Sequence, residues 1–204
     1  MTIVGFKKNV IALMTIGLII FPCGGSSGNV QQSVEIGQSS LDNLDFEVER
    51  NGLPAYWYAG NGGIIEGGFK VSLDYVEKHS GNKSVKMEMS GVRDERNFGV
   101  LTGTLPIELV AGKTVEFKGW IKTKDVKNGY AGLWFRVDGE NRAVLGFDNM
   151  HNRGLTGTNN WTQVSIIMEV SKDVKNINFG GLFPGEGTAW FDNFELFING
   201  VKHI

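Results

Sequence analysis

The histidines are the side chains of this chain best suited to acid–base or metal chemistry, and they lie far apart. His79, His151 and His203 each stand alone in a polar or terminal stretch. The sequence contains no His-Glu-x-x-His zinc pattern and no phosphate-binding Gly-x-x-x-x-Gly-Lys. Since a hydrolase needs an activated nucleophile or a metal-bound water held by further groups, the sequence predicts a protein that is not an enzyme.

Aromatic and charged side chains instead share one face of a predicted strand. Along 130–138, alternate residues are apolar, and the other face carries Tyr130, Gly132, Trp134, Arg136 and Asp138. On the strand before, Trp120 similarly shares a face with the charged residues Glu116, Lys118 and Lys122. A sugar ring packs its C–H face on an aromatic ring while polar groups bind its hydroxyls. The alternative is that these rings cover the outer sheet or pack under a loop.

The most distinctive stretch is FDNMHNRGLTGTNNW at 147–161, which we predict as a polar loop between two strands. Loops on a rigid β-scaffold commonly carry recognition residues. The alternative is an ordered loop in which Asp148 and Arg153 pair with each other. The predicted ligand contacts are Trp120, Tyr130, Trp134, Arg136, Asp148, Asn149 and Arg153.

Period-two alternation recurs from about residue 42 to the end, and helical periodicity does not. The clearest predicted strands are 84–90, 114–124, 130–138, 143–147, 161–170, 176–183 and 188–198. Shorter ones are expected at 45–49, 69–74 and 98–101. About ten short strands separated by turns indicate an all-β fold, an antiparallel two-sheet β-sandwich or jelly roll.

Composition narrows the function classes. The 204 residues carry a formal net charge of −2, which gives no clustered basic surface for nucleic acid. The chain has 29 glycines and 4 prolines, which favours strands and tight turns. Cys23 is the single cysteine, so no internal disulfide and no cysteine-based metal centre can form.

The first residues predict export. Lys7 and Lys8 precede an apolar run at 10–21, which suits a signal peptide and is short for a membrane span. Pro22 and Cys23 follow, and the pattern resembles a bacterial lipoprotein signal, although that family usually has Gly, Ala or Ser before the cysteine. The resemblance implies lipidation of Cys23. An ordinary signal peptide or an uncleaved anchor is the alternative.

Short motifs in order along the chain resemble carbohydrate-binding-module-like (galactose-binding-like) jelly rolls. They are the NLDFE at 43–47, Trp57, the HSGNKS at 79–84 and the closing WFDN at 190–193. More narrowly, AGLWFRVDG at 131–139 and the 147–161 stretch look like an accessory domain. That domain is attached to bacterial tail-specific-type serine peptidases, erythromycin-esterase-like proteins and some regulators. The resemblance implies the jelly-roll fold.

The broader family often holds a structural calcium ion. Carried onto this chain, the resemblance implies Glu47, Asp192 and carbonyls near Gly81 and Lys83 as ligands, and hard oxygen donors of this kind suit Ca²⁺. The alternative is that Glu47 and Asp192 are ordinary carboxylates at strand ends.

Together these expectations describe a signal peptide at 1–22, a lipidated cysteine with a flexible tether at 23–41 and a binding domain at 42–204. The expected function is non-catalytic carbohydrate binding at the cell envelope of a bacterium, with contact to the membrane through the lipid alone. The alternative is a protein-interaction or scaffolding module of an envelope enzyme system. The oligomeric state is left open.

Overall fold

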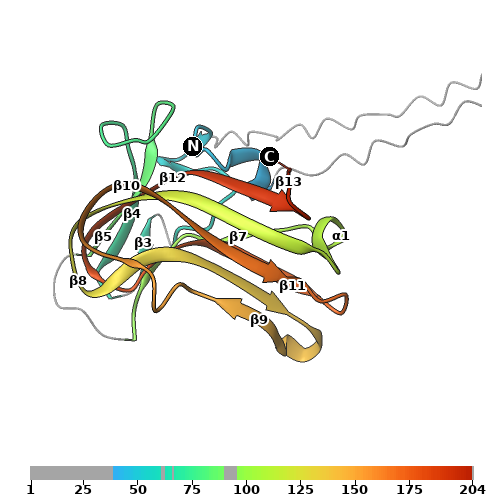
Figure 1. The fold of residues 1–204 in the computed structure, drawn as a ribbon. Coiled ribbons are helices and arrows are strands. Elements are labelled where there is room, and N and C mark those ends of the chain that lie inside the picture. Colours follow the sequence, from blue (N-terminus) through green and yellow to red (C-terminus); the bar gives the residue numbers. More distant parts are fainter. Residues whose placement is uncertain (1–38, 61–62, 66, 90–95, 204) are drawn as a thin grey trace, which may run out of the picture. The chain divides into compact units, whose positions relative to one another are not determined.

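The computed structural model describes residues 39–60, 63–65, 67–89 and 96–203 (Figure 1). These belong to one compact unit that spans 36–204. The predicted signal peptide, Cys23 and most of the tether lie outside the described residues. Within the described ranges, no helix is long and apolar enough to cross a membrane.

The described chain is built almost entirely from strands. The helical segments are η1 (Ser40–Asn43), α1 (Ile107–Val110) and η2 (Glu140–Arg142). The first strands are β1 (Glu49–Arg50), β2 (Leu53–Pro54), β3 (Ile64–Ile65), β4 (Phe69–Asp74), β5 (Ser84–Met89), β6 (Gly99–Val100) and β7 (Gly103–Thr104). The remaining strands are β8 (Thr114–Asp138), β9 (Val144–Asp148), β10 (Leu155–Glu169), β11 (Asn176–Phe183), β12 (Glu186–Ile198) and β13 (Val201–Lys202).

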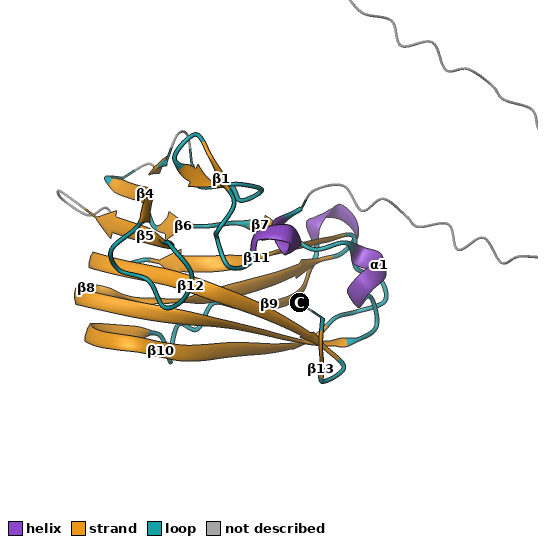
Figure 2. Ribbon diagram, turned by 90° about the horizontal axis from the view of Figure 1, so that it is seen from above, coloured by secondary structure: helices purple, strands orange, loops and turns teal. Residues whose placement is uncertain are grey.

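Strand β8 joins the two layers of the sandwich. Its first half pairs with β10 and β12, and β12 continues through β5 and β4 to β3. Its second half pairs with β11 and β9, and β11 continues to β6 and β7. All these pairings are antiparallel, and Figure 2 shows β12, β8 and β10 running side by side. The predicted strands 114–124 and 130–138 are thus parts of one strand that belongs to both sheets.

The two sheets enclose an aromatic core between them. Phe117 on the first half of β8 meets Phe179 of β11 edge to face, with ring centroids 5.0 Å apart. Both rings are fully buried, as are Leu133 and Phe135 on the second half of β8. Alternate residues of β8 therefore point into the core, as the period-two pattern predicts. The predicted all-β two-sheet architecture is confirmed.

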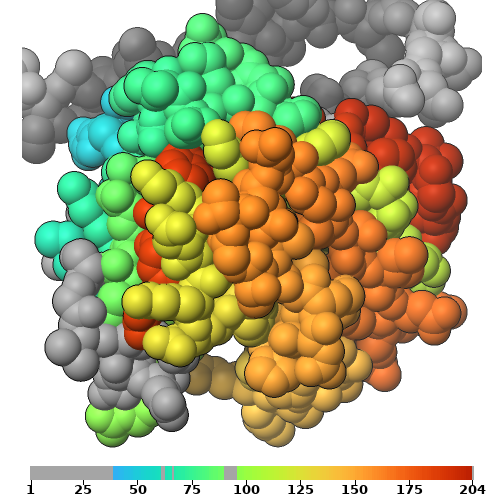
Figure 3. Space-filling model, turned by 60° about the vertical axis from the view of Figure 1, so that its left-hand side comes forward, coloured from blue at the N-terminus to red at the C-terminus, as the bar shows by residue number. Residues whose placement is uncertain are grey.

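The loop within the 147–161 stretch is shorter than the sequence predicts. Strand β10 already begins at Leu155 and pairs with β8 through several register shifts. Asn159 reaches Thr123 of β8, where its Nδ2 donates to the hydroxyl oxygen at 2.9 Å. The sequence pattern does not reveal this part of the strand because most of its side chains are polar and exposed. In Figure 3 the orange atoms of β10 lie beside the yellow atoms of β8. The connecting turn covers 149–154.

Candidate functional site

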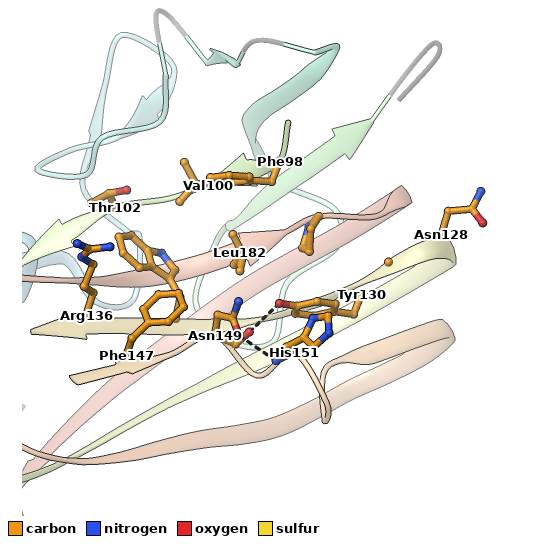
Figure 4. Close-up of a pocket in the computed structure, with 13 residues that line it drawn as sticks. Phe98, Val100, Thr102, Asn128, Tyr130, Arg136, Phe147, Asn149, His151 and Leu182 are labelled. Atoms are coloured by element: carbon orange, nitrogen blue, oxygen red, sulfur yellow. Dashed lines mark hydrogen bonds between the residues drawn. The ribbon is translucent and has the colours of Figure 1, made fainter. Parts of the chain in front are cut away.

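A cavity of about 690 Å³ lies on the outer face of the second sheet (Figure 4). Its walls come from β6, β8, β9, β11 and the turn after β9. The lining residues are Phe98, Val100, Thr102, Asn128, Gly129, Tyr130, Trp134, Arg136, Phe147, Asn149, His151, Leu182 and Pro184. The cavity is thus mainly apolar and aromatic, with a few hydrogen-bonding groups, which is the usual composition of a small-ligand site.

Trp134 is one of the aromatic residues that line the cavity. It is half-buried, and its indole Nε1 donates a hydrogen bond of 3.1 Å to the carbonyl oxygen of Leu101. Gly180 lies opposite Trp134 on β11 and has a φ of +150°. A Cβ at Gly180 would lie 2.0 Å from the Leu101 oxygen. Glycine at this position therefore lets the segment between β6 and β7 approach the sheet and anchor the indole.

Tyr130 forms another wall of the cavity, and both its hydroxyl and its ring contact the turn after β9. Its hydroxyl donates to the carbonyl oxygen of Asn149 at 3.0 Å, and its ring meets the edge of His151 (Figure 4). Burial, with a smaller effect from the nearby Asp148 carboxylate, raises the pKa of Tyr130 above its usual value. The phenol therefore remains a neutral hydrogen-bond donor at physiological pH.

The turn that carries Asn149 and His151 is fixed by Asp148 and Arg153. The guanidinium donates to both carboxylate oxygens, at 3.0 and 2.6 Å, and the amide of Met150 donates to Asp148 Oδ1 at 2.9 Å. Burial acts to raise the pKa of Asp148, but the hydrogen bonds from Arg153 and Met150 outweigh it, so the pKa lies below its usual value. Neither side chain lines the cavity. Asp148 and Arg153 thus form the ion pair with each other that the sequence predicts as the alternative to ligand contact.

Trp120 lies on the other sheet, away from the cavity. Its ring stacks on His79 with centroids 3.9 Å apart and an interplanar angle of 15°, and Trp161 meets His79 edge on. Within the described ranges, His79 Nδ1 is buried without a hydrogen-bond partner. Of the seven predicted ligand contacts, Tyr130, Trp134, Arg136 and Asn149 line the cavity, whereas Trp120, Asp148 and Arg153 do not. Ligand contact by these residues stays a prediction.

Several lining residues were missing from the predicted contacts. Phe147 is 53% exposed and lies opposite Arg136 in the register between β9 and β8. Its position at the start of the 147–161 stretch was the signal that could have identified it. Phe98, Val100 and Leu182 reach the cavity because β11 pairs with the second half of β8 and β6 pairs with β11. No local sequence pattern encodes that neighbourhood.

The lining offers hydrogen-bonding groups to a ligand, and none of its described residues is an Asp or Glu. The polar groups that face the cavity belong to amide, hydroxyl, imidazole and guanidinium side chains. These groups can donate to or accept from ligand hydroxyls.

The residues implied as calcium ligands take another role in this structure. Glu47 Oε1 accepts from the amides of Asn82 and Lys83, at 2.8 and 3.2 Å. Asp192 Oδ2 accepts from the amides of His79 and Ser80, at 2.7 and 3.0 Å. Both carboxylates thus bind N–H groups of the same turn, and amide hydrogens pointing at the carboxylates do not fit a cation there.

The pKa values of these two carboxylates are shifted in opposite directions. Burial raises the pKa of Asp192 above its usual value despite its hydrogen bonds to backbone amides. Burial also acts to raise the pKa of Glu47, but the hydrogen bonds from Asn82 and Lys83 outweigh it and leave a lowered value. Among the described residues, no group of three or more His, Cys, Asp or Glu side chains is arranged to hold a metal ion. The calcium ion itself stays a prediction.

Comparison with known sequences gives a partial match. No model of a known protein family matches the chain. The uncharacterized HTH-type transcriptional regulator YbfP of Bacillus subtilis (strain 168) is 34% identical over 125 residues. This match covers 61% of the chain and 42% of the regulator, so the chain spans less than half of that relative's length.

Comparison with solved structures identifies the fold. The CBM22-1 xylan-binding domain of Paenibacillus barcinonensis Xyn10C matches with a TM-score of 0.55 and 16% identity, over 76% of this chain and 91% of that domain. A family 16 carbohydrate-binding module matches with a TM-score of 0.50 and 16% identity, over 76% of this chain and 99% of the module. The fold is therefore the jelly roll of carbohydrate-binding modules, and the predicted resemblance is confirmed at the level of fold.

Proposed function

We propose that this domain binds carbohydrate, without catalysis, in the cavity on the outer face of the second sheet. The observation that carries the proposal is the half-buried Trp134 ring, which is anchored through its N–H and lines an open cavity. Such a ring offers an apolar platform to the C–H face of a sugar. Asn149, His151 and Thr102 supply hydrogen-bonding groups around it.

The geometry of the cavity supports an oligosaccharide over a single small sugar. Tyr130 and Arg136 both line it and are six residues apart on β8, which is roughly 20 Å at the rise of a strand. In the view of Figure 4, Arg136 and Phe147 lie toward one end of the row of lining residues and Asn128 lies at the other. The fold shared with xylan-binding domains is consistent with this assignment but does not name the sugar.

Binding of the whole chain to an array of plant, bacterial and fungal polysaccharides tests the proposal. We expect retention on at least one β-linked or acidic polysaccharide, and competition by the matching soluble oligosaccharide. Absence of binding to every glycan on the array would overturn it.

A second candidate is a protein-interaction module, as the sequence also allows. Among the described residues, β9 pairs with β8 alone, and it exposes Val144 at 54% and Leu145 at 42%. An edge strand with exposed apolar side chains can accept a strand from a partner. Two results together would favour this function. The chain would capture one defined envelope protein and lose it when Val144 is replaced by Lys, and it would bind no glycan on the array.

We also propose that the domain is exported and tethered to the cell envelope through a lipid on Cys23. The proposal is supported by the basic start, the apolar run and the position of the single cysteine. Labelling of cells with a tagged fatty acid tests it. Label that is absent, or that survives Cys23→Ala, would overturn it.

A further inference from the structure

Arg136 presents an unused edge of its guanidinium at the cavity. Its Nε donates to both carboxylate oxygens of Asp138, at 2.9 and 3.0 Å. Its terminal nitrogens Nη1 and Nη2 make no hydrogen bond within the described part of the chain. The side chain is 37% exposed, whereas that of Asp138 is 10% exposed. The buried carboxylate therefore orients the guanidinium and leaves its outer N–H groups free.

The position of Arg136 places these N–H groups beside aromatic surface. Phe147 lies directly opposite Arg136 in the register of β9 with β8. Trp134 is two residues away along β8 and points to the same face. Figure 4 shows Arg136 near Phe147, with Thr102 on the neighbouring wall. A sugar ring stacked against these aromatic residues would hold a substituent within reach of the guanidinium.

The charge of the lining favours an acidic substituent there. Among the described lining residues, Arg136 alone carries a permanent charge, and none is an Asp or Glu that would repel an anion. A guanidinium binds a planar carboxylate through two parallel hydrogen bonds, which a neutral hydroxyl cannot reproduce. Hydrogen bonds between ionised groups are also stronger than those between neutral groups.

From this geometry we infer that the cavity selects glycans that carry a uronic acid, with the carboxylate bound by Nη1 and Nη2 of Arg136. The inference rests on the proposed carbohydrate binding and adds the chemical class of the sugar. Asp138 is a positioning residue in this arrangement, because it holds the guanidinium without lining the cavity itself.

Calorimetric titration of the whole chain with matched sugars tests the inference. One pair is a galacturonic acid oligomer and its methyl ester. A second is a xylo-oligosaccharide with and without a glucuronic acid branch. We expect the acidic member of at least one pair to bind about tenfold more tightly or better, because it gains charge-assisted hydrogen bonds. This preference should weaken as the salt concentration rises.

The variant must avoid leaving a buried charge without its partner, which would threaten folding. The double variant Arg136→Gln with Asp138→Asn replaces both charges by amides, and its circular dichroism and melting curve check the fold. We expect the ratio of acidic to neutral affinity to fall toward one. Arg142→Gln is the matched control, since it removes an exposed arginine that does not line the cavity, and it should keep the ratio.

The possible results separate this inference from the function on which it rests. Equal binding of the acidic and neutral members would overturn the selectivity and leave carbohydrate binding standing. A preference that survives in the folded double variant would overturn the role of Arg136. No binding to any of these sugars would overturn the inference, and the polysaccharide array would then decide carbohydrate binding independently.

Discussion

The indole N–H of Trp134 is bonded to the carbonyl oxygen of Leu101, which belongs to the segment between β6 and β7. The same segment is itself held in place, because the amide of Leu101 donates to Gly181 and Thr102 exchanges hydrogen bonds with Tyr58. This lining ring is therefore fixed by backbone before any ligand arrives. Preorganisation of this kind reduces the entropy that binding costs.

Replacement of Trp134 by Ala should abolish glycan binding, because the stacking platform disappears. Because the variant loses a half-buried ring and its hydrogen bond, its free energy of unfolding should fall by roughly 2 kcal/mol, less than for a fully buried tryptophan. Calorimetric titration and thermal melting measure the two effects. Trp120→Ala is the matched control, because Trp120 stacks on His79 on the other sheet. It should lower stability and keep binding, whereas loss of binding in both variants would contradict the assignment.

Gly180→Ala should weaken both the fold and the site. The left-handed φ of Gly180 disfavours a side chain, and the new Cβ would meet the Leu101 oxygen, so the stability should fall by roughly 2 kcal/mol. Displacement of that oxygen removes the anchor of Trp134, so glycan affinity should fall as well. Chemical denaturation and titration measure these changes.

Gly157→Ala provides the control for backbone strain alone. Gly157 has a φ of +73°, but a Cβ there would meet nothing within 4 Å, and the residue does not line the cavity. This variant should lose about 1 kcal/mol of stability and keep its affinity. If Gly180→Ala also kept its affinity, the Leu101 contact would not be what positions the ring.

The sequence reveals the sandwich because burial imposes period two on each strand. Along β8 the alternation over 115–123 and again over 131–137 correctly identifies the core face. It cannot show that 114–138 is one continuous strand, since Asp125 to Gly129 look like a turn. Several of these residues have positive φ values, so the backbone bends there while pairing on both sides persists.

The site is less accessible to sequence reasoning because strand neighbours are set by long-range pairing. Trp120 and Trp134 have similar local patterns, yet β8 carries them to different sheets. Leu182 and Phe98 join the cavity from strands whose order in the jelly roll no local pattern encodes. Arg136 and Asn149 are predictable because they lie on the same strand or on the adjoining turn as the recognised aromatic residues.

EDTA should leave the melting temperature of the chain unchanged, because backbone amides already engage the carboxylates of Glu47 and Asp192. Glu47→Ala should instead lower the stability by about 1 kcal/mol, since the amides of Asn82 and Lys83 lose their acceptor. Differential scanning calorimetry with and without EDTA measures both. A fall of several degrees with EDTA, reversed by added Ca²⁺, would show that a cation binds and that the amides are not the principal partners.

The ion pair between Asp148 and Arg153 should make the turn 149–154 sensitive to acid. The folded-state pKa of Asp148 is depressed, so its stabilising contribution is present above the ordinary value near 3.8 and is lost as the pH falls through the lowered value. Because both groups are partly exposed, the contribution should be below about 1 kcal/mol. It should therefore appear as a local change before global unfolding.

The amide proton of Met150 reports this titration directly, because it donates to Asp148 Oδ1. In NMR spectra its chemical shift should stay constant down to about pH 4 and move below the ordinary pKa. The amide of His151 is an internal control, since it donates to Asn149 Oδ1, which does not titrate. Arg153→Gln should shift the Met150 transition to higher pH, because the guanidinium no longer favours the ionised carboxylate. A Met150 transition at the ordinary value in both proteins would contradict the ion pair as the group that holds this wall of the cavity.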